Sequence, residues 1–282
     1  MGKVIKKIGG YLLSKININI CRKINGAWVA VPMINGVKVG ISGEHWMSGA
    51  LKLLLPLAKG TFYDVGVNLG QTLVKVKTID AKRRYIGFEP NPSCLFYLQK
   101  LIEKNKWEDT VLVPVCLSDF DGLAKLNVTS DTDPEASIVA QSGEGDALKT
   151  KMVPVLRYQT IAEYLNKDSI GIIKIDVEGA EPEVLATLSP VIMKDRPLLL
   201  MEILPVQNEA EAQKIERQKN LMSQIRTLNY SLYRIMKSSE DHYRGIVRVS
   251  ELGLVLDPVF KDYVIIPEEK SSELESKLML QA

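Results

Sequence analysis

Acidic side chains follow several predicted strands of this chain, and the first of them precedes a turn rich in small residues. The segment Thr61–Thr72 reads T-F-Y-D-V-G-V-N-L-G-Q-T, in which a β-prone run reaches Asp64 and is followed by Gly66, Asn68 and Gly70 at alternate positions. A pattern that can begin a helix comes next. Glycine lets the backbone approach a ligand closely, and a helix N-terminus presents unpaired N–H groups. We therefore predict a strand–turn–helix corner that binds a nucleotide-like cofactor.

The amino-acid sequence of this turn discriminates among cofactors. The dinucleotide fingerprint G-x-G-x-x-G is absent from it, and the chain has no Walker-type G-K-[ST]. A carboxylate at Asp64 repels a pyrophosphate but attracts a cation, such as the amino group of a methionine-like tail. The pattern D-x-G-x-N-x-G therefore favours S-adenosylmethionine over NAD or ATP. A structural turn in another doubly wound protein is the alternative, because fold does not determine function.

Polar residues also stand at the ends of the later predicted strands. Ligands of an open parallel sheet bind beyond the carboxyl ends of its strands, which makes these side chains candidates for the site. The strand ends carry Asp64, Glu89, Ser118 with Asp119, Asp176 with Glu178, and Glu202. Glu89 lies roughly 20 residues beyond the glycine turn, where an acid binds the two ribose hydroxyls. Asp119 is placed either to accept from an adenine amino group or to form a turn before Gly122.

Lys174 stands inside an apolar strand, two residues before Asp176, so both side chains point to the same face of the sheet. A buried lysine is costly unless it is paired, and we expect Asp176 or Glu202 to be its partner. A structural ion pair and a catalytic pair both fit this pattern. Charges gathered in a cleft favour a functional role.

The elements that must position these residues alternate along the chain. Strands are predicted at 61–65, 84–89, 111–117, 171–177, 197–203, 230–236 and 260–266, and helices at 43–57, 70–79, 92–104, 181–188 and 209–228. This alternation predicts an α/β fold with a Rossmann-like, mostly parallel sheet covered by helices on both faces. The last two strands are expected to form an antiparallel edge hairpin. Residues 123–128 and 151–156 read as extended, and 130–150 as a long loop.

Three parts are expected along the chain. Residues 1–58 form a small N-terminal cap, with a basic arm, a β-ribbon of strands 27–32 and 37–41 around Asn35-Gly36, and a helix. Residues 59–267 form the main domain, and 268–282 form an acidic C-terminal tail.

Composition sets limits on the function. The 282 residues are 46% hydrophobic and 25% charged with a net charge of +2, as in ordinary globular proteins. Residues 1–43 contain basic residues and no acid, which predicts a solvated face or a weak contact with an anionic membrane surface. Specific nucleic-acid binding is not expected, since this arm has few aromatic residues. Cys21, Cys94 and Cys116 form no CxxC pair, and no secretory signal or run of 18 apolar residues is present, so we expect a cytoplasmic protein.

Four motifs together resemble the FkbM-type methyltransferases. They are D-V-G-V-N-L-G-Q-T at 64–72, I-G-F-E-P-N-P at 86–92, L-S-D-F-D-G at 117–122 and I-K-I-D-V-E-G-A-E at 173–181. Val67 departs from the family pattern, which usually has alanine there. The resemblance implies a class I Rossmann-like methyltransferase that uses S-adenosylmethionine and methylates a hydroxyl of a sugar, glycan or natural product. The cofactor-binding residues that it implies are Asp64, Gly66, Asn68, Gly70, Thr72, Glu89, Asn91, Ser118, Asp119 and Asp176.

Methylation of a hydroxyl requires removal of its proton as the new bond forms. The candidates for the catalytic set are Asp176, Glu178, Glu202 and Lys174, with His45 of the cap as another candidate base. The carboxylates would also suit a divalent cation, but no spacing demands one, and no metal is predicted. The alternatives are an RNA or protein methyltransferase and a non-catalytic cofactor-binding relative that acts as an interaction module. The acceptor and the oligomeric state are left open by the sequence.

Overall fold

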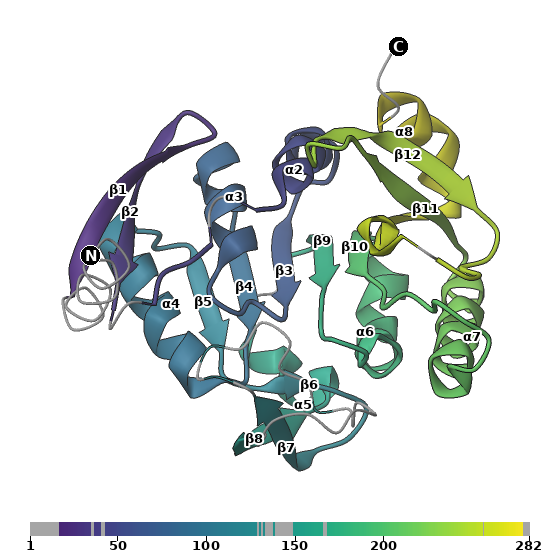
Figure 1. Ribbon diagram of the computed structural model, residues 1–282, viewed down its shortest axis with the longest axis horizontal. Helices are drawn as coiled ribbons and strands as arrows, with labels where there is room; N and C mark the ends of the chain where they lie inside the picture. The colour runs from purple at the N-terminus through teal and green to yellow at the C-terminus, as the bar shows by residue number, and fades with distance from the viewer. Residues whose placement is uncertain are drawn as a thin grey trace, which may run out of the picture.

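An eight-stranded sheet forms the centre of the protein, for which a computed structural model was obtained (Figure 1). The structure describes residues 17–34, 37–40, 43–128, 130, 132, 138, 149–165, 168–255 and 257–278. Most of the basic arm, the turn at Asn35-Gly36 and most of the predicted loop 130–150 lie outside the described residues.

The order of strands in the sheet is β12-β11-β13-β10-β9-β3-β4-β5. The strands are β3 (Thr61–Val65), β4 (Tyr85–Phe88), β5 (Thr110–Val113), β9 (Ile170–Ile175), β10 (Leu198–Glu202), β11 (Tyr230–Lys237), β12 (Tyr243–Val249) and β13 (Asp262–Pro267). Neighbours from β5 to β10 are parallel, whereas β13 is antiparallel to both β10 and β11. The predicted α/β fold with a mostly parallel sheet is confirmed. The two predicted last strands, β11 and β13, pair antiparallel as expected, but they are not an edge hairpin. The strand β12, which was not predicted, lies between them in the sequence, pairs with β11 and forms the edge of the sheet.

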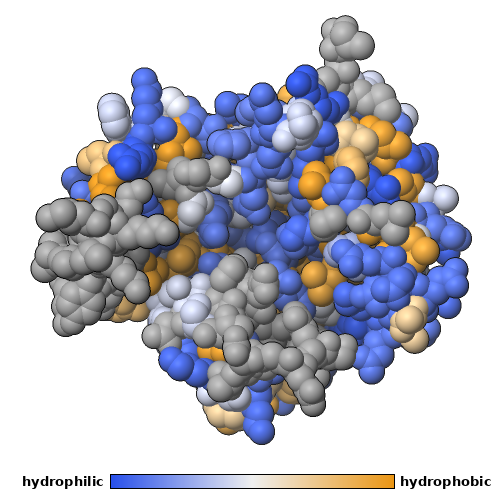
Figure 2. Space-filling model, viewed as in Figure 1, coloured by the Kyte–Doolittle hydropathy of each residue, from blue (hydrophilic) through white to orange (hydrophobic). Residues whose placement is uncertain are grey.

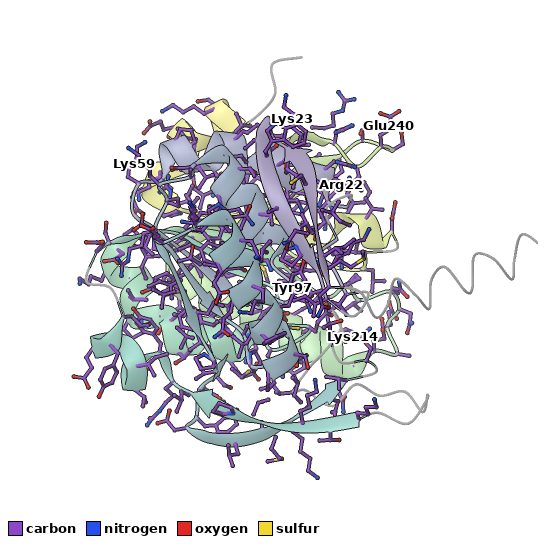
Figure 3. All side chains as sticks on the ribbon, turned by 90° about the vertical axis from the view of Figure 1, so that its left-hand side faces the viewer. Arg22, Lys23, Lys59, Tyr97, Lys214 and Glu240 are labelled. Carbon is purple, nitrogen blue, oxygen red and sulfur yellow. The ribbon has the colours of Figure 1, made fainter. Side chains whose placement is uncertain are left out.

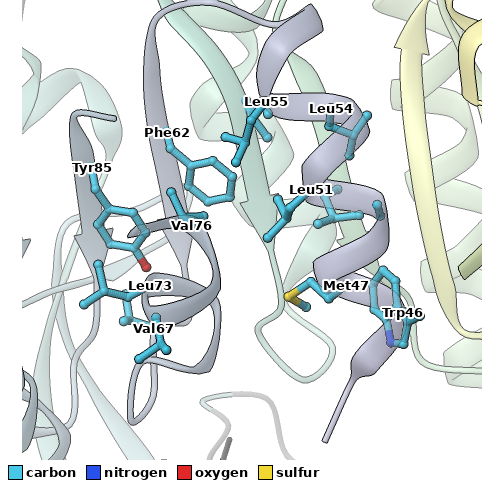
Figure 4. Packing of buried hydrophobic residues seen from close by; sticks show 14 of the residues in the cluster. Trp46, Met47, Leu51, Leu54, Leu55, Phe62, Val67, Leu73, Val76 and Tyr85 are labelled. Atoms are coloured by element: carbon cyan, nitrogen blue, oxygen red, sulfur yellow. The ribbon is translucent and has the colours of Figure 1, made fainter. Parts of the chain in front are cut away.

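Helices cover both faces of the sheet and bury its alternating side chains. The described helices are α2 (His45–Leu57), α3 (Gln71–Ile79), α4 (Pro92–Asn105), α5 (Tyr158–Ile161), α6 (Glu181–Asp195), α7 (Ala212–Thr227) and α8 (Ser271–Leu278). One apolar cluster joins α2, α3, α4 and α8 to one face, and Figure 4 shows α2 packed beside Phe62 of β3. A second cluster joins α6 and α7 to the other face, where Tyr63 points. Successive residues of a strand thus enter opposite layers.

The C-terminal segment differs from the predicted acidic tail. Its helix α8 buries Leu274 and Leu278 in the first apolar cluster, and the carbonyl of Leu278 accepts a hydrogen bond of 2.6 Å from the Tyr243 hydroxyl. Glu269 forms an ion pair with Arg196. Of the acids on α8, Glu273 is exposed and Glu275 is half-buried, so the predicted tail includes a helix that closes the core. None of the helices in the described residues is long and apolar enough to cross a membrane.

A small three-stranded sheet stands apart from the main one, at the bottom of Figure 1. It consists of β6 (Cys116–Leu117), β7 (Gly122–Val128) and β8 (Lys149–Leu156), in the order β6-β8-β7. The extended segments predicted at 123–128 and 151–156 are its two long strands. The single strand predicted at 111–117 is wrong, because the main-sheet strand ends at Val113 and Pro114, which has no N–H, precedes β6.

The N-terminal ribbon uses a different turn from the one predicted. Strands β1 (Ile18–Ile24) and β2 (Ala27–Met33) pair around Asn25-Gly26, where both residues have positive φ, as a two-residue hairpin turn requires. The turn Asn35-Gly36 is flanked only by an isolated bridge between Ile34 and Val37, so no strand is found at 37–40. The ribbon packs on α4, where Tyr97 donates to the Pro32 carbonyl and accepts from the Val39 N–H (Figure 3).

Gly66 is one of the positions at which the main sheet requires glycine. It has φ +88°, and a Cβ built there would lie 1.9 Å from the backbone oxygen of Asp176, the residue that follows β9 (Ile170–Ile175). Gly26 also has φ +88°, but nothing lies within 4 Å of its Cβ position. The two glycines share a left-handed backbone conformation and differ in the steric overlap that a Cβ would cause.

We expect Gly66→Ala to lower the free energy of unfolding by about 3 kcal/mol or more, because strain and overlap add. Gly26→Ala should lose only about 1 kcal/mol, the cost of the left-handed backbone for an L-residue. Urea unfolding of both variants provides the measurement. Equal losses of unfolding free energy in the two variants would contradict this expectation, because they would show that the backbone around Gly66 can move to accommodate a Cβ.

Candidate active site

A cleft of about 270 Å³ opens at the carboxyl ends of β3, β4, β9 and β10. Eight of the predicted site residues line it: Gly66, Asn68, Thr72, Glu89, Lys174, Asp176, Glu178 and Glu202. They meet because parallel strands end at the same edge of the sheet. Figure 2 shows that mainly hydrophilic side chains cover the centre of the face viewed there.

A buried lysine lies beneath this cleft between two aspartates. The register of β3 against β9 places Asp64 opposite Lys174, whose ammonium lies 3.4 Å from Asp64 Oδ1 and 3.0 Å from Asp176 Oδ2. It also donates to the Gly66 carbonyl at 3.2 Å. Burial disfavours the charged lysine, but Asp176 and Asp64 outweigh that effect and raise the pKa of Lys174 above its ordinary value. Lys174 therefore stays protonated and cannot act as a base.

Asp64 is fully buried under the cleft. Its Oδ2 accepts a short hydrogen bond from the Tyr85 hydroxyl, while Oδ1 has only the ion-pair contact with Lys174. Burial raises the pKa of Asp64, against the opposing effects of Lys174 and Tyr85. Asp64 has no exposed surface and does not line the cleft, so the structure gives no support to the expected direct contact with a methionine-like tail. The residue acts on the cleft through Lys174.

Glu89 connects the glycine turn to the start of α4. Its two carboxylate oxygens accept backbone N–H groups, Oε2 from Asn68 at 2.7 Å and Oε1 from Asn91 at 2.8 Å. Burial raises the pKa of Glu89 to about 7, although both N–H donors oppose the shift. Each oxygen keeps a second lone pair, and the side chain lines the cleft. Glu89 can therefore accept two further hydrogen bonds from a ligand.

Three carboxylates gather at the ends of β9 and β10. Oxygens of Asp176, Glu178 and Glu202 lie within 4.8 Å of one another. Burial raises the pKa of Glu202 to about 8, the charge of Asp176 adds to the shift, and the ion pair of Glu202 with Lys261 opposes it. The separation suits a divalent cation, the alternative left open by the sequence, but Lys174 and Lys261 already compensate two of the three charges.

The turn after β9 holds Glu178 in a strained conformation. Its φ of 52° is in the left-handed region, which is uncommon for a residue with a Cβ. The next residues are fixed by Glu181, whose carboxylate accepts from the Gly179 N–H at 2.9 Å, and burial raises the pKa of Glu181 to about 7. Strain of this kind is retained where the structure needs a particular side-chain direction. Here it turns the Glu178 carboxylate toward Asp176 and Glu202.

Five predicted cofactor-binding residues do not line the cleft, namely Asp64, Gly70, Asn91, Ser118 and Asp119. Asn91 is buried and caps α4 by accepting from the Ser93 N–H at 3.1 Å. Ser118 is buried and donates to Asp119, which is exposed. Because β5 ends at Val113, this pair follows a strand of the small sheet instead of the main one. The preceding Cys116 and Leu117 line the cleft in their place.

Other lining residues were missed by the sequence analysis. Glu44, Gln71 and Lys261 are polar, and the apolar end of the cleft is formed by Phe88, Val115, Cys116, Leu117, Leu126 and Ile138. Glu44 was the most accessible to sequence reasoning, since it is the first acid after 43 residues without one. Burial opposes its ionisation, yet Lys75, Lys174 and Lys237 hold the pKa of Glu44 below its ordinary value. His45, the candidate base from the cap, lines a separate cavity and not this cleft.

Removal of the buried lysine should destabilise the protein strongly. We expect Lys174→Met to lower the free energy of unfolding by about 3–5 kcal/mol, because it leaves Asp64 buried without its cation. The loss should be largest near about pH 8 and should shrink toward about pH 5, since Asp64 can then take up a proton and lose its charge. Urea unfolding at both pH values is the measurement. Lys125→Met, at an exposed position of β7, is the matched control and should show neither the loss nor its pH dependence.

Comparison with known protein families identifies the family of this chain. Residues 64–235, more than half of the chain, match the family described as Methyltransferase FkbM domain. No curated protein matches the chain. The matched range contains the glycine turn, Glu89 and the acids after β9 and β10.

Solved structures with similar folds include three methyltransferases of low sequence identity. The methyltransferase FkbM from Methylobacillus flagellatus has a TM-score of 0.45 and 13% identity, over 74% of this chain and 43% of that chain. An O-methyltransferase from Bacillus cereus in complex with SAH has a TM-score of 0.44 and 11% identity, over 80% of both chains. Fibrillarin from Aeropyrum pernix with bound S-adenosyl-L-methionine has a TM-score of 0.39 and 16% identity, over 89% of this chain and 96% of that chain. The family assignment rests on the sequence match, and by that match this chain belongs to the FkbM-domain methyltransferases.

Proposed function

We propose that this protein transfers a methyl group from S-adenosylmethionine to a hydroxyl group of a sugar, glycan or natural-product acceptor. The observation that carries the proposal is the position of Glu202, a carboxylate whose pKa is raised to about 8, in the same cleft as the glycine turn. A base of such a pKa is matched to removal of a proton near neutral pH. The membership of the FkbM methyltransferase family supports the transfer of a methyl group.

The cleft residues fit S-adenosylmethionine. Glu89 has two free lone pairs for the two ribose hydroxyls, and its backbone donors Asn68 and Asn91 hold it in place. The apolar end of the cleft between Phe88 and Leu117 suits a flat adenine ring. Five acids, Glu44, Glu89, Asp176, Glu178 and Glu202, line the remainder and favour a ligand that carries positive charge. Gly66 lets the backbone approach that ligand.

When bound, this cofactor supplies an electrophilic methyl group on a sulfonium. The chain's own task is to orient the acceptor and to remove its proton. We assign proton removal to Glu202, and orientation of the acceptor hydroxyl to Asp176, whose Oδ2 is held 3.0 Å from Lys174. Lys174 is then a positioning residue instead of the base. Asp64 supports it from below.

The affinity for S-adenosylmethionine should depend on the protonation of Glu89. Hydroxyl donors favour the carboxylate, so the affinity should be constant above about pH 7 and should fall by about tenfold per pH unit below it. Glu89→Gln should weaken binding by about 10- to 100-fold at pH 8 and should remove this pH dependence. Calorimetric titration measures both effects. Glu108→Gln, at an exposed position, is the control for loss of one charge, and a pH dependence that persists in Glu89→Gln would contradict the assignment.

Turnover should depend on Asp176 and Glu202 in different ways. Glu202→Gln should lower the rate of methyl transfer by about 10²–10⁴-fold, the usual contribution of a general base. Asp176→Asn should leave a folded protein with little turnover. Its residual rate should rise with pH at a lower pH than in the unchanged protein, because the negative charge that raises the pKa of Glu202 is gone. The pH–rate profile separates this role from a purely structural one, and Glu163→Gln, on the surface, should leave the rate unchanged.

Titration with S-adenosylmethionine and, separately, NAD tests the choice of cofactor. Micromolar binding of the first and none of the second supports the proposal. Formation of S-adenosylhomocysteine with a panel of hydroxyl acceptors then tests the reaction. Transfer to an RNA or to a protein, with none to sugars or small hydroxyl compounds, would replace the proposed acceptor class.

A further inference from the structure

A second and larger cavity, of about 600 Å³, lies beside the cleft. Its walls come from β1, residues 39, 40 and 43, α2, α3 and the start of β12. Gln71, the first residue of α3, lines both cavities. The wall between them contains an ion pair of 2.8 Å, with Lys75 on the side of the second cavity and Glu44 on the side of the cleft. The two cavities are therefore neighbours.

The second cavity is basic. Its described lining residues include Lys23, Lys52 and Lys75 and both histidines of the chain, and none of them is an acid. Glu44 compensates Lys75, whereas neither Lys23 nor Lys52 has an ion-pair partner in the described part of the chain. The segments of residues 1–43 outside the described residues contain no Asp or Glu. The cleft has the opposite character, because its lining contains five carboxylates against two lysines, Lys174 and Lys261.

The charges of the second cavity come from separate elements that converge. Lys23 lies on the β1–β2 hairpin, as Figure 3 shows, and Lys52 lies on α2. His45 begins α2 and its ring centroid is 5.6 Å from that of His242, next to β12. Two acids are near the histidines but do not line the cavity: Asp241 accepts the His45 N–H at 2.9 Å, and Glu240 is 3.9 Å from His242. The surface over α2 and α3 is mainly hydrophilic (Figure 2).

We propose that this cavity binds a phosphate or diphosphate group of the methyl acceptor. The inference rests on the proposed function and names its substrate class, a hydroxyl compound that carries phosphate. Lysine ammonium groups bind phosphate as point charges, and imidazole N–H groups and the Ser48 hydroxyl can donate to its oxygens. Asn25 and Ser48, whose side chains lie 3.4 Å apart, link the hairpin to α2 beside the lysines.

The arrangement separates the two ends of such an acceptor. The phosphate end lies among Lys23 and Lys52, and the hydroxyl end passes Gln71 to reach the acids of the cleft. An anion is excluded from the cleft by its carboxylates and attracted to the second cavity by its lysines. Besides the histidines, the only aromatic side chain in the described lining is that of Tyr243, which is buried. The cavity therefore lacks the stacking surface of a site for single-stranded nucleic acid.

Calorimetric titration with inorganic diphosphate at low salt tests the site. We expect binding that weakens with added salt and that persists when S-adenosylmethionine is present. The double variant Lys23→Gln/Lys52→Gln should bind diphosphate at least about tenfold more weakly, because two uncompensated charges are lost. The matched control, Lys104→Gln/Lys194→Gln, removes two exposed lysines of α4 and α6 that lie outside the cavity and should bind as the unchanged protein does.

A second probe identifies the source of the phosphate. Co-sedimentation with phosphatidylcholine vesicles that contain phosphatidic acid measures binding to a membrane-borne phosphate. Lysine-dependent binding of either probe supports the site, and the probe that binds distinguishes a soluble acceptor from a lipid-linked one. The inference would be overturned if neither probe bound, or if the double variant bound them as tightly as the unchanged protein. Competition between diphosphate and S-adenosylmethionine would also overturn it.

Binding of S-adenosylmethionine to the same variants separates this inference from the proposed function. The double variant should bind the cofactor normally, because Lys23 and Lys52 do not line the cleft. Cofactor binding without lysine-dependent phosphate binding would remove the phosphate site and leave the methyltransferase proposal standing. Absence of cofactor binding in the unchanged protein would remove the proposed function itself.

Discussion

The buried ion pairs of Lys174 are the interaction on which the cleft depends. One ammonium group neutralises Asp64 below the cleft and Asp176 at its surface, and it also holds the Gly66 carbonyl of the glycine turn. In this environment of low dielectric, the charge of Lys174 and that of the fully buried Asp64 each need the other, whereas Asp176 is partly exposed. The contact of Lys174 with Asp176 fixes the direction of that carboxylate. Removal of Lys174 therefore changes the stability of the protein and the geometry of the site together.

The glycine turn and Glu89 form a second constraint, built from backbone groups. Glu89 accepts the N–H of Asn68 from the turn after β3 and that of Asn91 from the turn after β4. A side chain with two such anchors has a fixed rotamer before any ligand arrives, so ligand binding pays little entropy to order it. Its pKa near 7 follows from the same burial that fixes it. Preorganisation and pH sensitivity thus have one cause.

Sequence reasoning was sufficient where a local rule determined the structure. The meeting of Glu89, Asp176, Glu178 and Glu202 followed from parallel strands that end on acids. The pairing of Asp64 with Lys174 did not, because it depends on the register of strands that lie far apart in the chain. The two I-N-G segments at 24–26 and 34–36 carry the same hairpin signal, but only the first joins two strands, whereas the second is flanked by the single bridge between Ile34 and Val37. The second cavity combines residues from β1, α2, α3 and β12, which lie far apart in the sequence, so no local pattern predicts it.

The ion pair of Glu44 with Lys75 lets an acidic cleft and a basic cavity lie next to each other. Lys75 is nearly buried, whereas Glu44 keeps 39% of its side-chain surface exposed, so the pair is neutral as a unit but polar on the side of the cleft. If Lys75 were uncompensated, it would attract the phosphate end of an acceptor up to the wall and away from Lys23 and Lys52. If Glu44 were uncompensated, it would repel that end from the passage at Gln71. Because the wall is neutral, the orientation of the acceptor depends on the carboxylates of the cleft and on the lysines of the second cavity. Both groups of charges favour the same orientation, with the phosphate end in the second cavity.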